Sequence, residues 1–176
     1  PDRMDWLLEN GLTFASLPCL VWTWRRRRLS DRAYVQITVF LVLHTIGAHY
    51  TYAKVPVGFW VQHGLRLARN HYDRLGHFAQ GFVPAIVVRE LLLRRSPLER
   101  GKWLFFLVTC VCLAGSAGYE FIEWAAALLG GSSADAFLGT QGDVWDTQWD
   151  MFVALIGAMS AQLLLARVHD RQLARL

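Results

Sequence analysis

Long apolar runs, separated by short basic clusters, dominate the pattern of this chain. A helix that spans a bilayer needs about 20 mostly apolar residues, and five runs approach that length. In most of them the apolar residues occur on every side of the helix, as in segments that contact lipid. The pattern predicts an all-α, polytopic transmembrane helix bundle that forms a single domain over residues 1–176. We expect five spans, at residues 6–24, 33–53, 75–93, 103–129 and 146–166.

The first run differs from the others at its start, where Glu9 and Asn10 interrupt it. No basic leader precedes this run, and its arginines follow it instead. We therefore expect a spanning helix rather than a cleaved signal peptide. Because the sequence opens on Pro1, we also expect a few residues to precede it.

The basic residues predict the orientation of the bundle. Thirteen of the 18 Lys and Arg residues flank the spans on one side, and five lie on the other. Short loops rich in Lys and Arg stay in the cytoplasm. With five spans the two sets alternate consistently, which places the N-terminus outside and the C-terminus in the cytoplasm. Tryptophans such as Trp24, Trp103 and Trp149 fall near span ends, where the amphipathic ring is stable.

Composition narrows the choice of partners. Hydrophobic residues make up 54% of the chain, and the net charge is +4. The basic residues lie in short clusters between apolar runs and form no continuous basic face, so we expect no nucleic-acid partner. The expected partners are the lipid bilayer and other subunits of a membrane-protein complex.

Acidic and histidine side chains gather at the predicted outer ends of the spans. Ten of the 14 Asp and Glu residues lie on that side, although the orientation rule does not require it. Residues three or four apart share one helix face, and such pairs are Asp73 with His77, Glu120 with Glu123, and Asp146 with Asp150. An ionisable residue within a span costs about 2.5–3.5 kcal/mol. We therefore expect these groups to converge inside the bundle or on a water-filled cup open to the outside.

Carboxylate and imidazole ligands without a thiolate suit a hard or borderline divalent metal such as Mn, Fe, Zn or Mg. The candidate ligands are Asp73, His77, Glu120, Glu123, Asp146 and Asp150, with His49 and Asp143 as further candidates. Nearby carboxylates repel one another, so they need a cation, a histidinium, an arginine or a shared proton. The alternative is a ligand-free polar network that ties the helices together.

No sequence signature assigns catalytic residues. The chain has neither a phosphate-binding glycine-rich loop nor a Gly-x-Ser-x-Gly elbow, and no organic cofactor is expected. Small residues in the last two spans are expected to let those spans approach closely. They are Ala114, Gly118, Gly157 and Ala161.

Three functions are compatible with this pattern. The first is a metal or acid–base site that acts on an envelope or lipid-linked substrate. The second is a cation or proton transporter, for which Arg89 and Glu90 are the only candidates at the inner end. Residues 82–88 in the middle of that span are apolar, which counts against transport. The third is a non-catalytic subunit of a larger membrane complex.

Four stretches resemble the YjdF-like family of bacterial inner-membrane proteins, a family without a known reaction. They are LHTIGAHYTYAKVP from Leu43, NHYDRLGHFAQG from Asn70, SAGYEFIEW from Ser116 and GTQGDVWDTQWDM from Gly139. The resemblance implies a multi-pass protein of the bacterial inner membrane. A looser similarity is to VanZ-like membrane proteins, which have an Asp-x-x-x-His at the start of one span and an Asp-rich start to the last. This chain lacks the Asn that often follows the Asp in the last span of those proteins.

The predicted topology can be tested with reporter fusions. A reporter that is active only in the periplasm should be silent when fused after Leu176 and active when inserted near Ser133. The physical reason is the retention of basic loops in the cytoplasm. The reverse pattern would move the acidic cluster to the cytoplasmic side.

Overall fold

The fold is all-helical in the part of the chain that the computed structural model describes, residues 6–7, 10–130 and 140–175. Ser133 lies outside these residues. The described helices are α2 (Gly11–Arg26), α3 (Asp31–His49), α4 (Pro56–Leu65), α5 (Tyr72–Arg95), α6 (Lys102–Gly130) and α8 (Asp146–Leu173). The expected all-α class is confirmed for these ranges, where no strand occurs.

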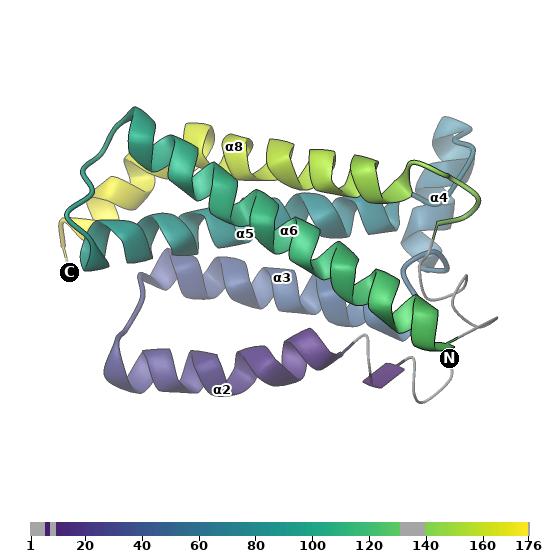
Figure 1. Cartoon of the computed structure of the whole chain (residues 1–176), viewed down its shortest axis with the longest axis horizontal. Helices are drawn as coiled ribbons and strands as arrows, with labels where there is room; N and C mark the ends of the chain where they lie inside the picture. The colour runs from purple at the N-terminus through teal and green to yellow at the C-terminus, as the bar shows by residue number, and fades with distance from the viewer. Residues whose placement is uncertain (1–5, 8–9, 131–139, 176) are drawn as a thin grey trace.

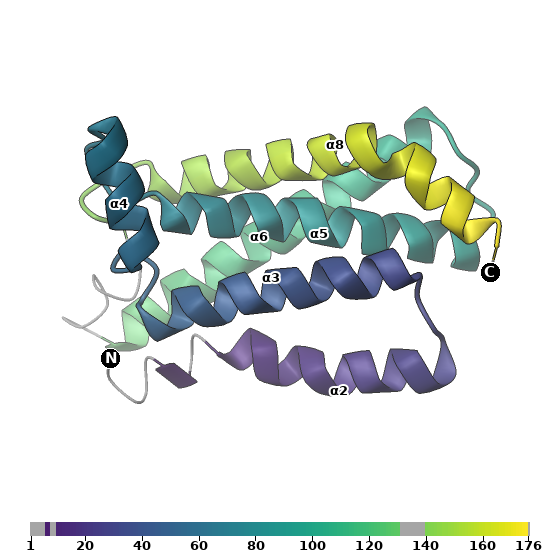
Figure 2. The same ribbon diagram turned by 180° about the vertical axis from the view of Figure 1, so that it is seen from behind.

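The long helices form a bundle whose members alternate in direction along the chain (Figures 1 and 2). Helix α5 lies between α3 and α8, and α6 crosses over them. Helix α2 runs along the edge of the bundle, beside α3. Helix α4 lies crosswise at one end, called here the α4 end. The C-terminal end is the opposite one.

Small residues let α5 and α8 pack at close range. A Cβ atom at Gly81 would overlap the backbone carbonyl of Ala154, and one at Gly157 would overlap that of Phe78. Between this point of closest approach and the C-terminal end of the bundle, α6 adds Leu104 and other apolar side chains to the buried core. Close approach of α8 to α5 therefore fixes the geometry of the bundle.

The expected role of small residues in the last two spans holds only in part. Ala161 is buried in the core that α6 and α8 share, as predicted. Gly157 instead contacts α5, and Gly118 has no neighbouring atom within 4 Å of a Cβ position. Ala114 is exposed. The prediction paired α6 with α8 because they are consecutive spans, whereas the tightest contact is between α5 and α8.

The bundle presents a largely apolar outer surface. Two described helices, at Lys102–Leu128 and Asp146–Leu173, are long and apolar enough to cross a membrane. Large side chains such as Val35, Phe121 and Leu163 are more than 60% exposed, which water disfavours and lipid does not. The count of five spans stays a prediction, because α2, α3 and α5 do not meet the same test of length and composition.

Helix α4 was not predicted from the sequence. Pro56 occupies its first turn, where a missing N–H costs nothing, and Arg66 ends it in the left-handed region with φ 54°. Trp60 is 73% exposed and Leu65 is 68% exposed. A short apolar helix that lies crosswise to the bundle helices (Figure 1) suits the membrane–water interface.

Gly157 and Gly118 give a matched pair of substitutions. Gly157→Ala should lower the free energy of unfolding by about 1–3 kcal/mol, because the added methyl group meets the α5 backbone. Gly118→Ala should be neutral or stabilising by up to about 1 kcal/mol, because alanine favours the helix and nothing obstructs it. Thermal unfolding in detergent measures both. Equal effects of the two substitutions would contradict the close contact of α5 with α8.

Candidate functional site

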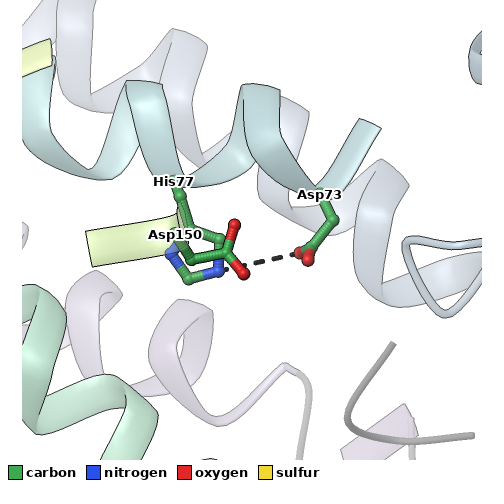
Figure 3. A group of neighbouring side chains, drawn as sticks. All are labelled: Asp73, His77 and Asp150. Atoms are coloured by element: carbon green, nitrogen blue, oxygen red, sulfur yellow. Dashed lines mark ion pairs between the residues drawn. The ribbon is translucent and has the colours of Figure 1, made fainter. Parts of the chain in front are cut away.

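Four ionisable side chains meet at the α4 end, and together they are called here the acid–histidine cluster. They are Asp73 and His77 on α5, Glu120 on α6 and Asp150 on α8, all buried. Asp73, His77 and Asp150 each direct one ligand atom into a space in which these atoms lie within 4.8 Å of one another (Figure 3). The cluster thus joins three helices, as the helical spacing predicts.

His77 has loose partners on both sides. Its Nε2 atom lies 3.7 Å from Asp73 Oδ1, and its Nδ1 atom lies 3.6 Å from Glu120 Oε1. Both distances exceed those of a normal hydrogen bond. His77 Nδ1 and Glu120 Oε1 are buried and make no hydrogen bond within the described residues. Such atoms cost free energy unless a proton, a water or an ion satisfies them.

Two arginines neutralise the acids beside the cluster and form what is called here the arginine clamp. Arg74 binds Asp143, Asp146 and Asp150 at 3.0, 2.7 and 3.0 Å. Arg69 binds Asp146 at 2.6 Å. The side chains of both arginines are about nine-tenths buried, so the pairs are shielded from water. Guanidinium groups therefore compensate the charge of these acids.

His71 does not add a fixed positive charge to the clamp. Partial burial and the neighbouring Arg69 and Arg74 lower the pKa of His71 below its ordinary value. This lowering of the pKa favours the neutral ring, so the two arginines carry the compensation.

Asn70 holds the segment that carries Arg69 in place. Its fully buried side chain donates to the Val55 carbonyl at 3.0 Å and accepts from the Tyr72 N–H at 3.0 Å. The Gln141 side chain pairs with the backbone N–H and carbonyl of Asn70 at 3.1 and 2.9 Å. Gly58 is required beside it, because a Cβ there would overlap the Asn70 amide. These bonds connect α4, α5 and the segment before α8.

Tyr52 closes the other side of the cluster. Thr51 and Tyr52 have φ values of 52° and 45°, a left-handed turn that folds the Tyr52 ring back over Gly47. The Tyr52 hydroxyl bonds to His44 Nδ1. Gly76 on α5 lies against the same ring. The stretch from His44 to Tyr52 therefore places the Tyr52 ring between α3 and α5. This contact is called here the Tyr52 seal.

A small cavity of about 30 Å³, lined by apolar and ionisable side chains, remains between the cluster and this seal. Asp73, His77 and Glu123 line it, together with His44 and Tyr52. This volume accommodates about two water molecules, or an ion with a water. The cavity is the place where a ligand would reach His77 and the acids.

The predicted site residues separate into three groups. Asp73, His77, Glu120 and Asp150 form the cluster, and Glu123 lines the cavity. Asp143 and Asp146 belong to the arginine clamp instead. His49 ends α3, is exposed and packs against Tyr50, so it is not part of the cluster.

A second ionic network at the C-terminal end was missed from the sequence. Glu90 is fully buried and accepts from the Ser30 N–H at 2.8 Å and from Arg94 at 2.7 Å. It also contacts His169 at 3.3 Å, and Arg89 binds His169 at 3.0 Å. Arg89 and Arg100 both bind Asp170, at 2.7 and 3.0 Å. Arg89 and Glu90, considered from the sequence as the inner end of a transport path, are thus tied to other side chains.

Apolar residues separate the two networks along α5. Ala79, Val83, Ala85 and Ile86 are buried between them. The described residues of α5 therefore offer no continuous line of ionisable groups from one end to the other. One feature of the sequence points to the second network, the adjacent Arg89 and Glu90 at the inner end of a predicted span, but nothing identifies His169 as their partner.

An apolar helical bundle with ionic networks buried at both ends defines an integral membrane protein. The family model described as "Predicted membrane protein (DUF2238)" matches residues 1–171, and the chain belongs to this family. The chain is 52% identical over 174 residues to "Inner membrane protein YjdF" of Escherichia coli (strain K12). That match covers 99% of this chain and 83% of the relative. No solved structure matches.

These comparisons confirm the YjdF-like resemblance and support an inner-membrane location. They do not bear on the looser VanZ-like similarity, which stays a prediction. The stretches that carried the resemblance have structural roles at the α4 end. They supply the Tyr52 seal, Asn70, Arg74 of the arginine clamp with its acidic partners, and the acid–histidine cluster.

Removal of Arg74 tests the clamp. Arg74→Met should lower the free energy of unfolding by about 3–5 kcal/mol, because it leaves buried carboxylates without their cation. Adding Asp146→Asn should restore part of that loss. The control is Arg28→Met, which breaks an exposed pair with Asp31 and should cost about 0–1 kcal/mol. Chemical unfolding in detergent measures all three, and similar losses for Arg74→Met and Arg28→Met would refute a buried clamp.

Proposed function

We propose that this protein is a five-span inner-membrane protein whose acid–histidine cluster faces the periplasm and binds a divalent metal. The metal site would act on an envelope or lipid-linked substrate. The observation that carries the proposal is the convergence of Asp73, His77 and Asp150 from two helices, with ligand atoms within 4.8 Å of one another.

The alternation of helix directions supports five spans. Helices α2, α3, α5, α6 and α8 run in turn toward opposite ends of the bundle (Figures 1 and 2). Arg26, Arg95 and Lys102 then fall at the C-terminal end, on the side assigned to the cytoplasm. Helix α4 and the cluster fall at the opposite end, which would be periplasmic.

The ligand set supports a metal such as Mn, Fe, Zn or Mg. Two carboxylates and one imidazole, without a thiolate, are the donors that these ions share. Three protein ligands leave a coordination position for water or substrate, which distinguishes a catalytic zinc-type site from a closed structural one. The adjoining cavity supplies space for that fourth ligand. Glu123, which lines the cavity, and Glu120, which faces His77, would hold or move a proton there.

The arginine clamp makes the proposal electrostatically reasonable. Without Arg69 and Arg74, five or more carboxylates would repel one another around one metal. With them, two positive charges compensate Asp143 and Asp146 and partly compensate Asp150, which Arg74 also binds. The remaining negative charge lies on the cluster. A divalent cation would then neutralise the negative charge that remains on the cluster.

The same clamp favours a second candidate, a non-catalytic subunit of a larger membrane complex. If the arginines and His77 together neutralise the acids, the whole assembly holds helices together without a ligand. The transporter hypothesis has less support, because apolar residues separate the two networks along α5.

Metal dependence of stability distinguishes these two functions. A bound metal should stabilise the folded protein by RT ln(1 + [L]/Kd), about 2.7 kcal/mol at a hundredfold excess over Kd. Asp73→Asn should abolish this gain while leaving the arginine clamp intact, since Asp73 contacts His77 rather than an arginine. Thermal unfolding in detergent, with a chelator and then with Mn²⁺ or Zn²⁺, provides the measurement.

Asp170→Asn is the matched control, a carboxylate removed at the opposite end of the bundle. It should retain the full stabilisation by metal. A wild-type protein whose stability does not respond to any of these metals would reject the metal site and leave the accessory-subunit function.

A further inference from the structure

We propose that an acyl chain of a phospholipid occupies a groove between α2, α3 and α5, with the polar end of the lipid at the acid–histidine cluster. This inference deepens the proposed function, because it assigns a glycerophospholipid as the substrate class of that site.

The groove is apolar and open on one side. Its volume is about 290 Å³, and its lining includes Leu12 and Leu20 of α2, Ile37 and Phe40 of α3, and Val83 and Val87 of α5. Hydrocarbon is the ligand chemistry that such a lining favours, since burial of apolar surface is its main source of affinity.

The groove adjoins the cavity of the candidate site. Leu12 and Phe40 line both spaces, so a molecule that fills the groove ends next to the cavity beside His77. From Leu12 to Thr23 the groove follows α2 over a length of roughly 16 Å, at about 1.5 Å per residue. This is about half of the roughly 30 Å hydrocarbon core, the thickness of one leaflet. An amphiphile with one tail in this leaflet would have its polar end near the cavity.

Helix α2 is suited to be a movable wall of the groove. None of its residues is buried, and its contacts with α3 are few and include the Thr23–Tyr34 hydrogen bond and the Trp24–Tyr34 ring contact at the C-terminal end. Its outer side chains, such as Leu17 at 51% exposure, face the surroundings of the bundle. In a bilayer these surroundings are acyl chains, which can enter beside α2 without leaving the membrane.

Photo-crosslinking tests this inference on the full chain. The protein is reconstituted into vesicles of phosphatidylethanolamine and phosphatidylglycerol that contain a phosphatidylethanolamine with a diazirine in mid-chain. After illumination, trypsin releases residues 75–89 as one peptide, bounded by Arg74 and Arg89. No α5 residue from 76 to 90 is exposed on the outer surface. Labelling at residues 83–87 therefore requires a chain inside the groove.

Two substitutions of neighbouring small residues on α2 make the test specific. Ser16 lines the groove and Ala15 does not. Ser16→Trp should reduce the labelling of residues 83–87 about tenfold, which corresponds to about 1.4 kcal/mol of lost occupancy. Ala15→Trp should leave it unchanged. Labelling of the exposed α3 surface at Val35 and Val39 should be the same in all three proteins, and circular dichroism checks their folding.

Two results would overturn the inference. One is the absence of label at residues 83–87 in the wild type while the α3 surface is labelled. The other is equal labelling in Ser16→Trp and Ala15→Trp. Stabilisation by Mn²⁺ or Zn²⁺ is measured on the same samples. A metal response without groove labelling would reject the lipid groove alone, and labelling without a metal response would reject the metal site alone.

Discussion

The structure depends on the pairing of charged side chains on α5, a polar helix placed at the centre of an apolar bundle. A charged side chain inside a membrane costs about 2.5–3.5 kcal/mol on insertion scales. Helix α5 carries Asp73, Arg74 and His77 near one end and Arg89 and Glu90 toward the other. Most of their partners lie on α8 or directly before it. The close approach of these two helices through Gly81 and Gly157 brings the partners within reach.

The two ionic networks differ in how completely they are satisfied, and this difference separates a structural role from a functional one. At the C-terminal end, the contacts of Glu90, His169 and Asp170 are all 3.3 Å or shorter. At the α4 end, the two contacts of His77 are 3.6 and 3.7 Å, and a cavity lies beside them. Close pairing leaves little for a ligand to gain, whereas loosely paired buried groups bind a proton, a water or an ion favourably.

Much of this architecture is predictable from the sequence, for identifiable reasons. Apolar runs predict the helices, and i, i+3 and i, i+4 spacing predicts that Asp73, His77 and Asp150 turn inward from their helices. The hydropathy of α5 does not identify it as a membrane-spanning helix, because the helix carries polar residues that are buried against α8. Helix α4 was missed because ten residues are too few for a span.

The arginine clamp shows a limit of reasoning from a single helix at a time. Asp146 and Asp150 share one face of α8, as predicted, but Asp146 pairs with Arg69 and Arg74 and does not join the cluster. Arg69 precedes α5 and reaches Asp146 only because Asn70 is fixed by Val55 and Gln141. The contacts of Asn70 with Gln141 and of Arg69 with Asp146 join residues 71 and 77 positions apart, which no local pattern in one sequence reveals.

The position of the site near one end of the bundle explains why a cluster of ionisable groups and an apolar groove lie next to each other. Helix α4 lies crosswise at the end of the bundle, with Trp60 exposed, as suits the membrane interface. The cluster is in the first turns of α5 and α8, just inside that level. In the proposed orientation, headgroups and water would meet hydrocarbon at this depth, so a cavity lined by ionisable groups and an apolar groove can share a boundary at Leu12 and Phe40. A site one or two helical turns deeper would meet only acyl chains, and one outside the bundle would lack the low dielectric that strengthens the pairing of His77 with its acids.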